Sequence, residues 1–263
     1  MPTPPIINDH LETVAKKFLK LRSEPKELLY FGLELEVERS YSISSKSELA
    51  IAKELKRLNK YLHIKRDGSI SNGFELADQP QTLQYFYKHI YEWQQIFDIL
   101  CKFEYYDDNA AGFHIHINGN YLTKDEIVKL YYFVHSQKSL FTKVGRRSGG
   151  YHYEYKRMTK VEYNNKFNED TLGYGYQRNE ALNITNLPNR GTLEFRLFRS
   201  TIDIKLFIAT IEFVDIVVNY IKNMHKDTVI NKKDARYAFI GYFMKHFNRY
   251  NCLDTIIKDV IEC

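Results

Sequence analysis

The chain has 263 residues, of which 44% are hydrophobic, and 38 lysine and arginine residues against 33 acidic residues give a formal net charge of +5. This composition is that of a globular protein and excludes both a disordered chain and a bundle of membrane-spanning helices. A pI near 8.8 is compatible with an anionic ligand, but it is lower than the value above about 9 that marks a nucleic-acid-binding domain.

The cysteines and the most apolar stretches of the sequence indicate in which cell compartment the protein is expected. The three cysteines are scattered outside any C-x-x-C spacing, so we expect neither a disulfide framework nor a thiolate zinc site. The N-terminus lacks the basic stretch and apolar core of a secretion signal, and the most apolar window, 206–221, is interrupted by Glu212 and Asp215. We therefore expect a cytoplasmic protein with reduced thiols and no membrane partner.

No internal repeat, low-complexity segment or proline-rich linker divides the sequence. We expect one domain over residues 1–263, with a motif-bearing core of about 28–202 and a helical C-terminal part of about 203–263. The length is enough to bury a large core.

The first predicted elements are a helix over 9–21, a strand over 29–38 and a helix whose apolar stripe runs over 51–62. Alternate residues of the strand differ in chemistry, because one set is apolar and the other includes Glu34, Glu36 and Glu38. One face of this strand is therefore expected in the core, and the other is acidic.

Two short strands are predicted next, over 61–66 and 73–77, and the second carries Glu75. A helix with an apolar stripe over 83–100 follows Pro80.

The segment 112–118 is predicted to be a strand with Phe113, Ile115 and Ile117 on one face and with His114, His116 and Asn118 on the other. A capping box at 123–126 then predicts a helix that runs towards residue 141. A further strand is expected over 151–156.

The last predicted strands cover 181–187 and 192–199, and the second directs Glu194 and Arg196 away from its apolar side chains. Helices over 204–222 and 234–248 and a short C-terminal helix complete the chain. Strands and helices do not alternate strictly, which favours an α+β domain with a mainly antiparallel sheet.

If these strands share one sheet, their polar faces form a common surface that contains Glu34, Glu36, Glu75, Glu194, His114 and His116. Converging carboxylates repel one another, so they are either partly protonated or neutralised by bound cations. Successive residues on one face of a strand lie about 7 Å apart, so neighbouring carboxylates could serve two ions, or one ion from two sides. Carboxylates with a minority of imidazole favour Mg²⁺ or Mn²⁺ over zinc. An arginine beside such ions, here Arg196, is typical of a site that receives phosphate.

Each part of this pattern also has a structural interpretation. Alternating glutamates are common on a solvated sheet face, and a pair of histidines is often structural. Arg196 could form only a surface ion pair with Glu194, worth about 0–1 kcal/mol. The conjunction of the three features favours a site.

Several short segments follow one another in a fixed order: 31–36 (FGLELE), 67–69 (DGS), 73–76 (GFEL), 112–116 (GFHIH), Arg178 with Asn183, and 191–198 (GTLEFRLF). This ordered series resembles the amidoligase family, which belongs to the carboxylate–amine ligase superfamily with glutamine synthetase and glutamate–cysteine ligase. The resemblance covers about 28–202. It implies a glutamine synthetase-like catalytic domain, in which helices pack on the convex face of a curved antiparallel sheet and the concave face holds ATP with two or three Mg²⁺ ions.

The resemblance also implies the reaction and its participants. ATP phosphorylates a substrate carboxylate, and an amine attacks the acyl phosphate to give an amide or isopeptide bond. The substrates would be a small-molecule or peptide carboxylate and amine, which the sequence does not identify. No G-x-x-x-x-G-K-[ST] loop is present, in line with this chemistry.

Roles are assigned to individual residues on the same resemblance. The implied metal ligands are Glu34, Glu36, Asp67, Glu75, Glu194 and one histidine, His114 in preference to His116. Arg196 would stabilise the transferring phosphoryl group, and Arg178 and Asn183 would contact nucleotide or substrate. The basic segment 143–160, with Arg146 and Arg147, either closes over nucleotide phosphates or is a solvated loop.

Two other classes of function remain as alternatives. A metal-dependent hydrolase or oxygenase would use the pair His114 and His116, although the neighbouring residues fit neither a cupin nor an amidohydrolase barrel. A non-enzymatic nucleic-acid-binding protein would use the basic segment 143–160 with the 15% aromatic residues, but the acidic strand face would repel phosphate unless metals intervene.

Overall fold

The structure is a computed structural model that describes residues 7–8, 28–39, 41, 44–66, 68, 70–106, 111–147, 153–156, 176–225, 228 and 231–262. One open sheet lies at its centre. Its strands are β1 (Ile7–Asn8), β2 (Phe31–Arg39), β3 (His63–Lys65), β4 (Gly73–Ala77), β5 (Tyr105–Tyr106), β6 (Gly112–Asn118), β7 (Leu182–Asn183) and β8 (Thr192–Arg199).

The strand order is β1-β3-β4-β2-β6-β8-β7, and β5 pairs with β2. All pairings are antiparallel except that of β1 with β3. The longest strands, β2, β6 and β8, are therefore neighbours in the middle of the sheet, although some 160 residues separate the first from the last.

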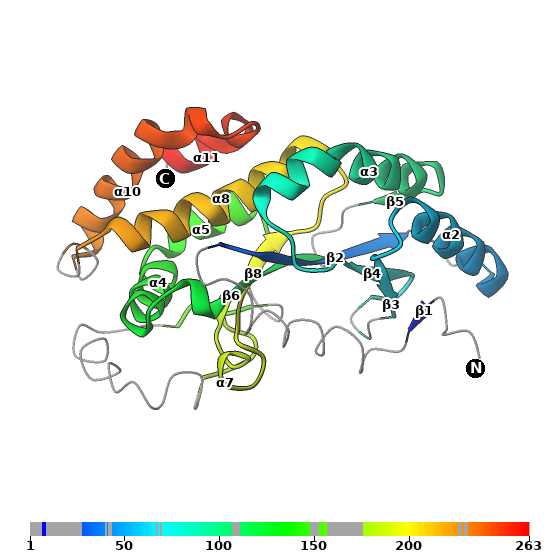
Figure 1. Cartoon of the computed structure of the whole chain (residues 1–263), viewed down its shortest axis with the longest axis horizontal. Helices are drawn as coiled ribbons and strands as arrows, with labels where there is room; N and C mark the ends of the chain where they lie inside the picture. The colour runs from blue at the N-terminus through cyan, green and yellow to red at the C-terminus, as the bar shows by residue number, and fades with distance from the viewer. Residues whose placement is uncertain are drawn as a thin grey trace.

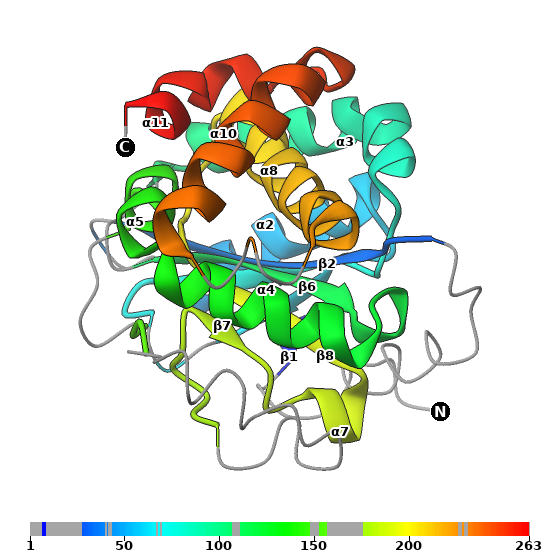
Figure 2. The same cartoon turned by 90° about the vertical axis from the view of Figure 1, so that its left-hand side faces the viewer.

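Helices pack around this sheet and complete the α+β fold. They are α2 (Ser45–Leu58), α3 (Leu83–Lys102), α4 (Lys124–Ser136), α5 (Lys138–Gly145), α7 (Leu187–Arg190), α8 (Ile204–Asn223), α10 (Lys232–His246) and α11 (Ile257–Ile261), with the 3₁₀ turns η2 (Gly119–Tyr121), η4 (Phe247–Arg249) and η5 (Leu253–Ile256). Helices α3 and α8 lie along the same side of the sheet, with α10 and α11 beyond α8 (Figures 1 and 2).

Aromatic side chains join the sheet to this helical layer. Phe207 of α8 stacks on Phe113 of β6 with ring centroids 4.9 Å apart, and Trp93 of α3 packs on Phe207 at 4.7 Å. The apolar face of each central strand is thus buried against helices, and its alternate residues point to the opposite face of the sheet. The predicted antiparallel α+β class is confirmed.

Several boundaries differ from the predictions for local reasons. The helix predicted over 123–141 is interrupted at Gln137, whose φ of −98° and ψ of 40° are not helical. The helix with the stripe over 51–62 begins earlier, where the Ser44 side chain caps it, and ends at Leu58. The strand predicted over 181–187 ends at Asn183, where the side-chain oxygen accepts a hydrogen bond from the Thr185 N–H and turns the chain, and the short helix α7 follows from Leu187.

Two predicted elements are not fully described. The helix over 9–21 lies outside the described residues. Of the strand over 151–156, residues 153–156 are described, and there Glu154 forms an isolated bridge with Glu180. Within the described part of the chain, no helix combines the length and apolar character needed to cross a bilayer.

Candidate functional site

Strand register brings the acidic and imidazole side chains together. Glu36 of β2 lies opposite Glu75 of β4, Glu34 of β2 lies opposite His114 of β6, and His116 lies opposite Glu194 of β8. Directly opposed residues of an antiparallel pair have side chains on the same face, with Cβ atoms about 5 Å apart. We call Glu34, Glu36, Glu75, His114, His116 and Glu194 the acidic cluster.

Three members of the acidic cluster converge on one point. Ligand atoms of Glu34, His116 and Glu194 all lie within 4.8 Å of one another, and the distance from His116 Nε2 to Glu34 Oε2 is 3.4 Å. Atoms that share an ion at about 2.1–2.2 Å lie about 3–4.4 Å apart, so the three side chains need move little to bind one. Two carboxylates and an imidazole fit Mg²⁺ or Mn²⁺.

The hydrogen bonds of His114 indicate a different role for this residue from that of His116. Its Nε2 lies 3.2 Å from Arg147 Nη1. A guanidinium only donates hydrogen bonds, so Nε2 accepts and the ring proton is on Nδ1. That nitrogen faces Glu194 Oε1 at 3.7 Å and Glu34 Oε2 at 3.9 Å. The geometry therefore makes His116 the candidate imidazole ligand, whereas the family resemblance implies His114.

Glu194 is held from two sides. Its Oε1 accepts a hydrogen bond from Arg196 Nη1, and its Oε2 accepts one from Asn183 Nδ2 at 2.7 Å. The Asn183 amide is oriented in turn, because its Oδ1 accepts from both the backbone and the hydroxyl of Thr185. Asn183 thus acts on the carboxylate of Glu194, and the sequence predicts only that it contacts nucleotide or substrate.

Glu75 is paired with a lysine that the sequence does not single out. Lys65 lies opposite Glu75 in the register of β3 and β4. Its Nζ contacts Glu75 Oε1 and lies 3.6 Å from Glu34 Oε1. The signal that could have found it is alternation within 61–66, where Leu62 and Ile64 are buried and Lys65 lies on the other face.

The side chain of Glu36 points towards Gly112, the first residue of β6. This side chain accepts a hydrogen bond from the backbone N–H of Gly112 and lies 3.6 Å from Arg147 Nη2. Arg147 is 3% exposed, and it also donates to the carbonyl of Arg196 at 3.3 Å. This arginine is therefore built into the acidic cluster rather than displayed on a basic loop.

Opposite charges in and around the acidic cluster stabilise one another's ionised forms. Burial alone would raise the pKa of Glu34, but His116, His114 and Lys65 together hold it well below its usual value. Burial opposes the charged form of His116 as well, and Glu34 and Glu194 more than offset it, so the pKa of His116 is raised. The pKa of Glu194 is lowered, because His116, Arg196 and His114 outweigh burial.

Three of the predicted site residues are not joined to the acidic cluster by any contact that the structure describes. Arg146 donates through Nε to Asp259 of α11 at 3.2 Å, and Arg178 is exposed. Asp67 lies outside the described residues.

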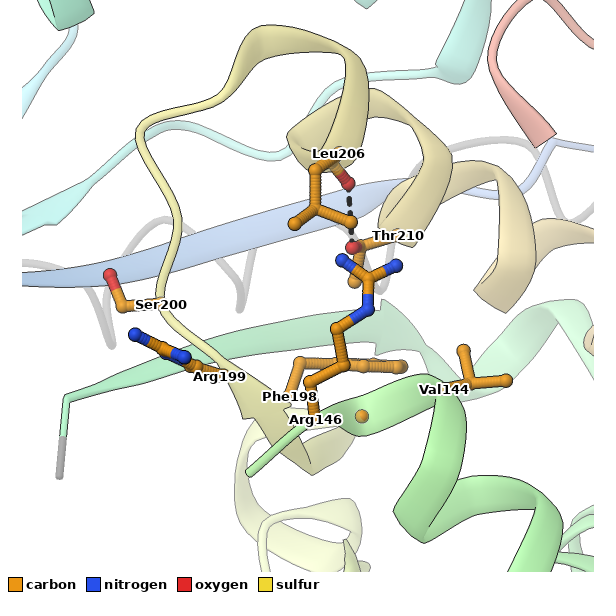
Figure 3. Close-up of a pocket in the computed structure, with 8 residues that line it drawn as sticks. Val144, Arg146, Phe198, Arg199, Ser200, Leu206 and Thr210 are labelled. Atoms are coloured by element: carbon orange, nitrogen blue, oxygen red, sulfur yellow. Dashed lines mark hydrogen bonds between the residues drawn. The ribbon is translucent and has the colours of Figure 1, made fainter. Parts of the chain in front are cut away.

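The backbone explains why consecutive arginines separate. Arg146 has a φ of 53°, which places it in the left-handed region at the end of α5 and turns the chain between the two side chains. Its guanidinium lines a small pocket between α5, β8 and α8 (Figure 3). The pocket is lined by Val144, Gly145, Arg146, Phe198, Arg199, Ser200, Leu206 and Thr210.

Comparison with solved structures finds similarity to the crystal structure of a bifunctional glutathione synthetase from Pasteurella multocida. The identity is 11% and the TM-score is 0.47, with 95% of this chain and 48% of that chain covered. The chain thus spans about half the length of that protein. Comparison with curated proteins finds no match.

A family model described as "Putative amidoligase enzyme" matches residues 82–218. The match contains β6 with both histidines and β8 with Glu194 and Arg196, and it begins after β2 and β4. It covers a little over half of the 263 residues, and on this match the chain belongs to the amidoligase family.

Proposed function

We propose that this protein is an ATP- and Mg²⁺-dependent carboxylate–amine ligase that forms an amide or isopeptide bond through an acyl phosphate. In this proposal the described chain acts as one catalytic domain of the glutamine synthetase type. The face of the sheet opposite α3 and α8, which carries the acidic cluster, is the reaction surface.

One observation carries the proposal beyond family membership. Side chains from three separate strands, Glu34 of β2, His116 of β6 and Glu194 of β8, bring their ligand atoms within 4.8 Å of one another. Arg196 lies beside them and donates a hydrogen bond to Glu194 Oε1. A cluster of oxygen and imidazole ligands next to a guanidinium suits a metal-bound phosphate.

The protein's own groups would divide the work as follows. Glu34, His116 and Glu194 would hold Mg²⁺, which when bound offsets charge on the nucleotide phosphates. The substrate carboxylate attacks the γ-phosphorus and displaces ADP. The amine then attacks the acyl carbon, displaces phosphate and gives up one proton. Arg196 would stabilise the negative charge that develops during phosphoryl transfer. The reaction needs no nucleophile from the protein, because ATP activates the substrate carboxylate.

Two further residues would support this arrangement. Asn183 and Arg147 hold Glu194 and Glu36 in place through the contacts described above. Arg178 is exposed at the turn before β7, and we assign it to nucleotide or substrate contact.

The test is Mg²⁺-dependent formation of ADP from ATP in the presence of pools of carboxylates and amines. We expect Glu34→Gln and Glu194→Gln each to lower the rate by at least about 100-fold, because each removes a charged ligand while keeping the shape of the side chain. Glu38→Gln is the matched control: Glu38 lies on the same face of β2 and accepts a hydrogen bond from the Ser71 backbone outside the acidic cluster. Full turnover in both cluster variants, with the fold intact by circular dichroism, contradicts the proposal.

Arg196→Lys tests the phosphate-binding role separately. We expect a loss of at least about 100-fold in kcat, because an ammonium cannot reproduce the planar, two-pronged grip of a guanidinium. Equal kcat values in wild type and variant would remove Arg196 from the mechanism.

A further inference from the structure

Lys65 is a buried cation inside the acidic cluster that the proposed mechanism does not use. It is 8% exposed, and it reaches the cluster from β3, on the far side of β4 from β2. Its Nζ contacts Glu75 Oε1 and lies 3.6 Å from Glu34 Oε1. The ammonium therefore sits between carboxylates from two different strands.

A lysine in this position needs a strong compensating interaction, because moving an ammonium out of water costs several kcal/mol. Glu75 and Glu34 supply that interaction. An ammonium is a compact point charge, so between two carboxylates it provides the neutralisation that a bound metal ion would otherwise provide. Lys65 and a metal ion would compete for the same oxygens.

The other two glutamates of the acidic cluster each have a cationic partner as well. Glu36 is matched by Arg147 at 3.6 Å, and Glu194 by Arg196. With all four carboxyls ionised, the four glutamates face three cationic side chains, which leaves a net charge of about −1. Before nucleotide binds, one divalent ion would change this net charge to about +1, which suits a phosphate, whereas three ions would raise it to about +5.

We propose that Lys65 takes the place of a second divalent cation, so that the acidic cluster holds one ion, at Glu34, His116 and Glu194. This inference rests on the metal site of the proposed function. It differs from the two or three Mg²⁺ ions that the family resemblance implies, and it assigns Glu75 to Lys65 instead of to a metal.

The test counts Mn²⁺ ions per chain by isothermal titration calorimetry, without nucleotide and without any measurement of activity. We expect one ion in wild type and two in Lys65→Met, because the variant releases Glu75 and the second oxygen of Glu34. The control is Lys129→Met, which removes an equally buried lysine that pairs with Asp125 at 3.5 Å in α4. This control is expected to bind one ion.

A double variant, Lys65→Met with Glu75→Leu, replaces both partners by apolar groups and protects the fold from an unpaired buried charge. We expect it to bind one ion again, because the second site needs Glu75. Two or more ions in wild type overturn the inference and leave the proposed function standing, and so does a folded Lys65→Met variant that binds only one. If wild type binds no Mn²⁺, the metal site of the proposed function fails together with the inference. Even if Lys65→Met does not fold, two or more ions in wild type still overturn the inference.

Discussion

At the scale of single residues, the two histidines of β6 differ in what holds their rings. Arg147 donates to His114 Nε2, so the remaining nitrogen of His114 carries a proton and orients towards the carboxylates. His116 Nε2 faces Glu34 at 3.4 Å. In the proposed function, the His114 imidazole therefore positions the carboxylates, and the His116 imidazole would itself bind the metal ion.

This difference predicts unequal effects of matched substitutions. His116→Gln should weaken Mn²⁺ binding by at least about tenfold more than His114→Gln, because only His116 contributes a ligand atom. Electron paramagnetic resonance of free Mn²⁺ in a titration gives both affinities. A larger loss for His114→Gln would reverse the assignment of the two rings.

Asp78 gives a pH-dependent prediction outside the acidic cluster. Its side chain is 2% exposed, and burial raises its pKa to about 6, although hydrogen bonds from Gln79, Asn59 and Gln81 oppose the rise. The folded state thus binds this proton more tightly than the unfolded state. The stability that the neutral acid contributes is fully present below about pH 4 and is lost as the pH rises through about 6.

We expect the free energy of unfolding of the wild type to fall by up to about 3 kcal/mol between pH 4 and pH 7.5 as Asp78 ionises. Asp78→Asn cannot ionise at this position, so this part of the fall should be absent from the variant. Urea unfolding across this range measures it, with the exposed Asp98→Asn as the control. A difference between wild type and Asp78→Asn that stays constant with pH would contradict the raised pKa.

At the scale of elements, the site depends on how closely α5 approaches β8. Gly145 ends α5 beside Leu197, and a Cβ built on it would lie 2.5 Å from the carbonyl oxygen of Leu197. A backbone atom cannot move aside as a flexible side chain can. Arg147 follows Gly145 by two residues and contacts Glu36 of the acidic cluster. The close contact of this helix end with β8 therefore helps to place Arg147.

We therefore expect Gly145→Ala to lower the free energy of unfolding by about 1–3 kcal/mol. Gly241→Ala in α10 is the matched control, because a Cβ there meets nothing within 4 Å. In a helix interior that change should raise stability by about 0.5–1 kcal/mol. Chemical denaturation of the two variants compares them, and equal effects would show that α5 can shift away from β8 at little cost.

The elements that the sequence predicted well are those with a two-sided chemistry. In β2, β6 and β8, apolar and polar residues alternate, so the sequence specifies the strand and its buried face together. The register that sets Glu34 against His114 and His116 against Glu194 depends on pairing between distant segments, which a single strand does not encode.

The parts that the sequence missed depend on contacts between elements. Lys65 lies in a strand of three residues, too short for its alternation to stand out. Arg147 reads as part of a basic run, and its burial follows from the left-handed turn at Arg146 and from the packing of α5 on β8. These are tertiary effects that override local composition.

At the scale of the whole molecule, the sheet separates two environments. Helices α3 and α8 cover its apolar face (Figure 1), and the acidic cluster occupies the opposite face across β4, β2, β6 and β8. In the proposed function the fold serves as the support, and the chemistry would reside in a few side chains of the central strands.

A crystal of the protein grown with Mn²⁺ and a non-hydrolysable ATP analogue tests the central claim most directly. Anomalous scattering locates the metal without reference to any assumed reaction. We predict a peak in contact with Glu34, His116 and Glu194, with the analogue's phosphates on its open side near Arg196. Metal or nucleotide bound elsewhere, with these three side chains free of both, would contradict the account.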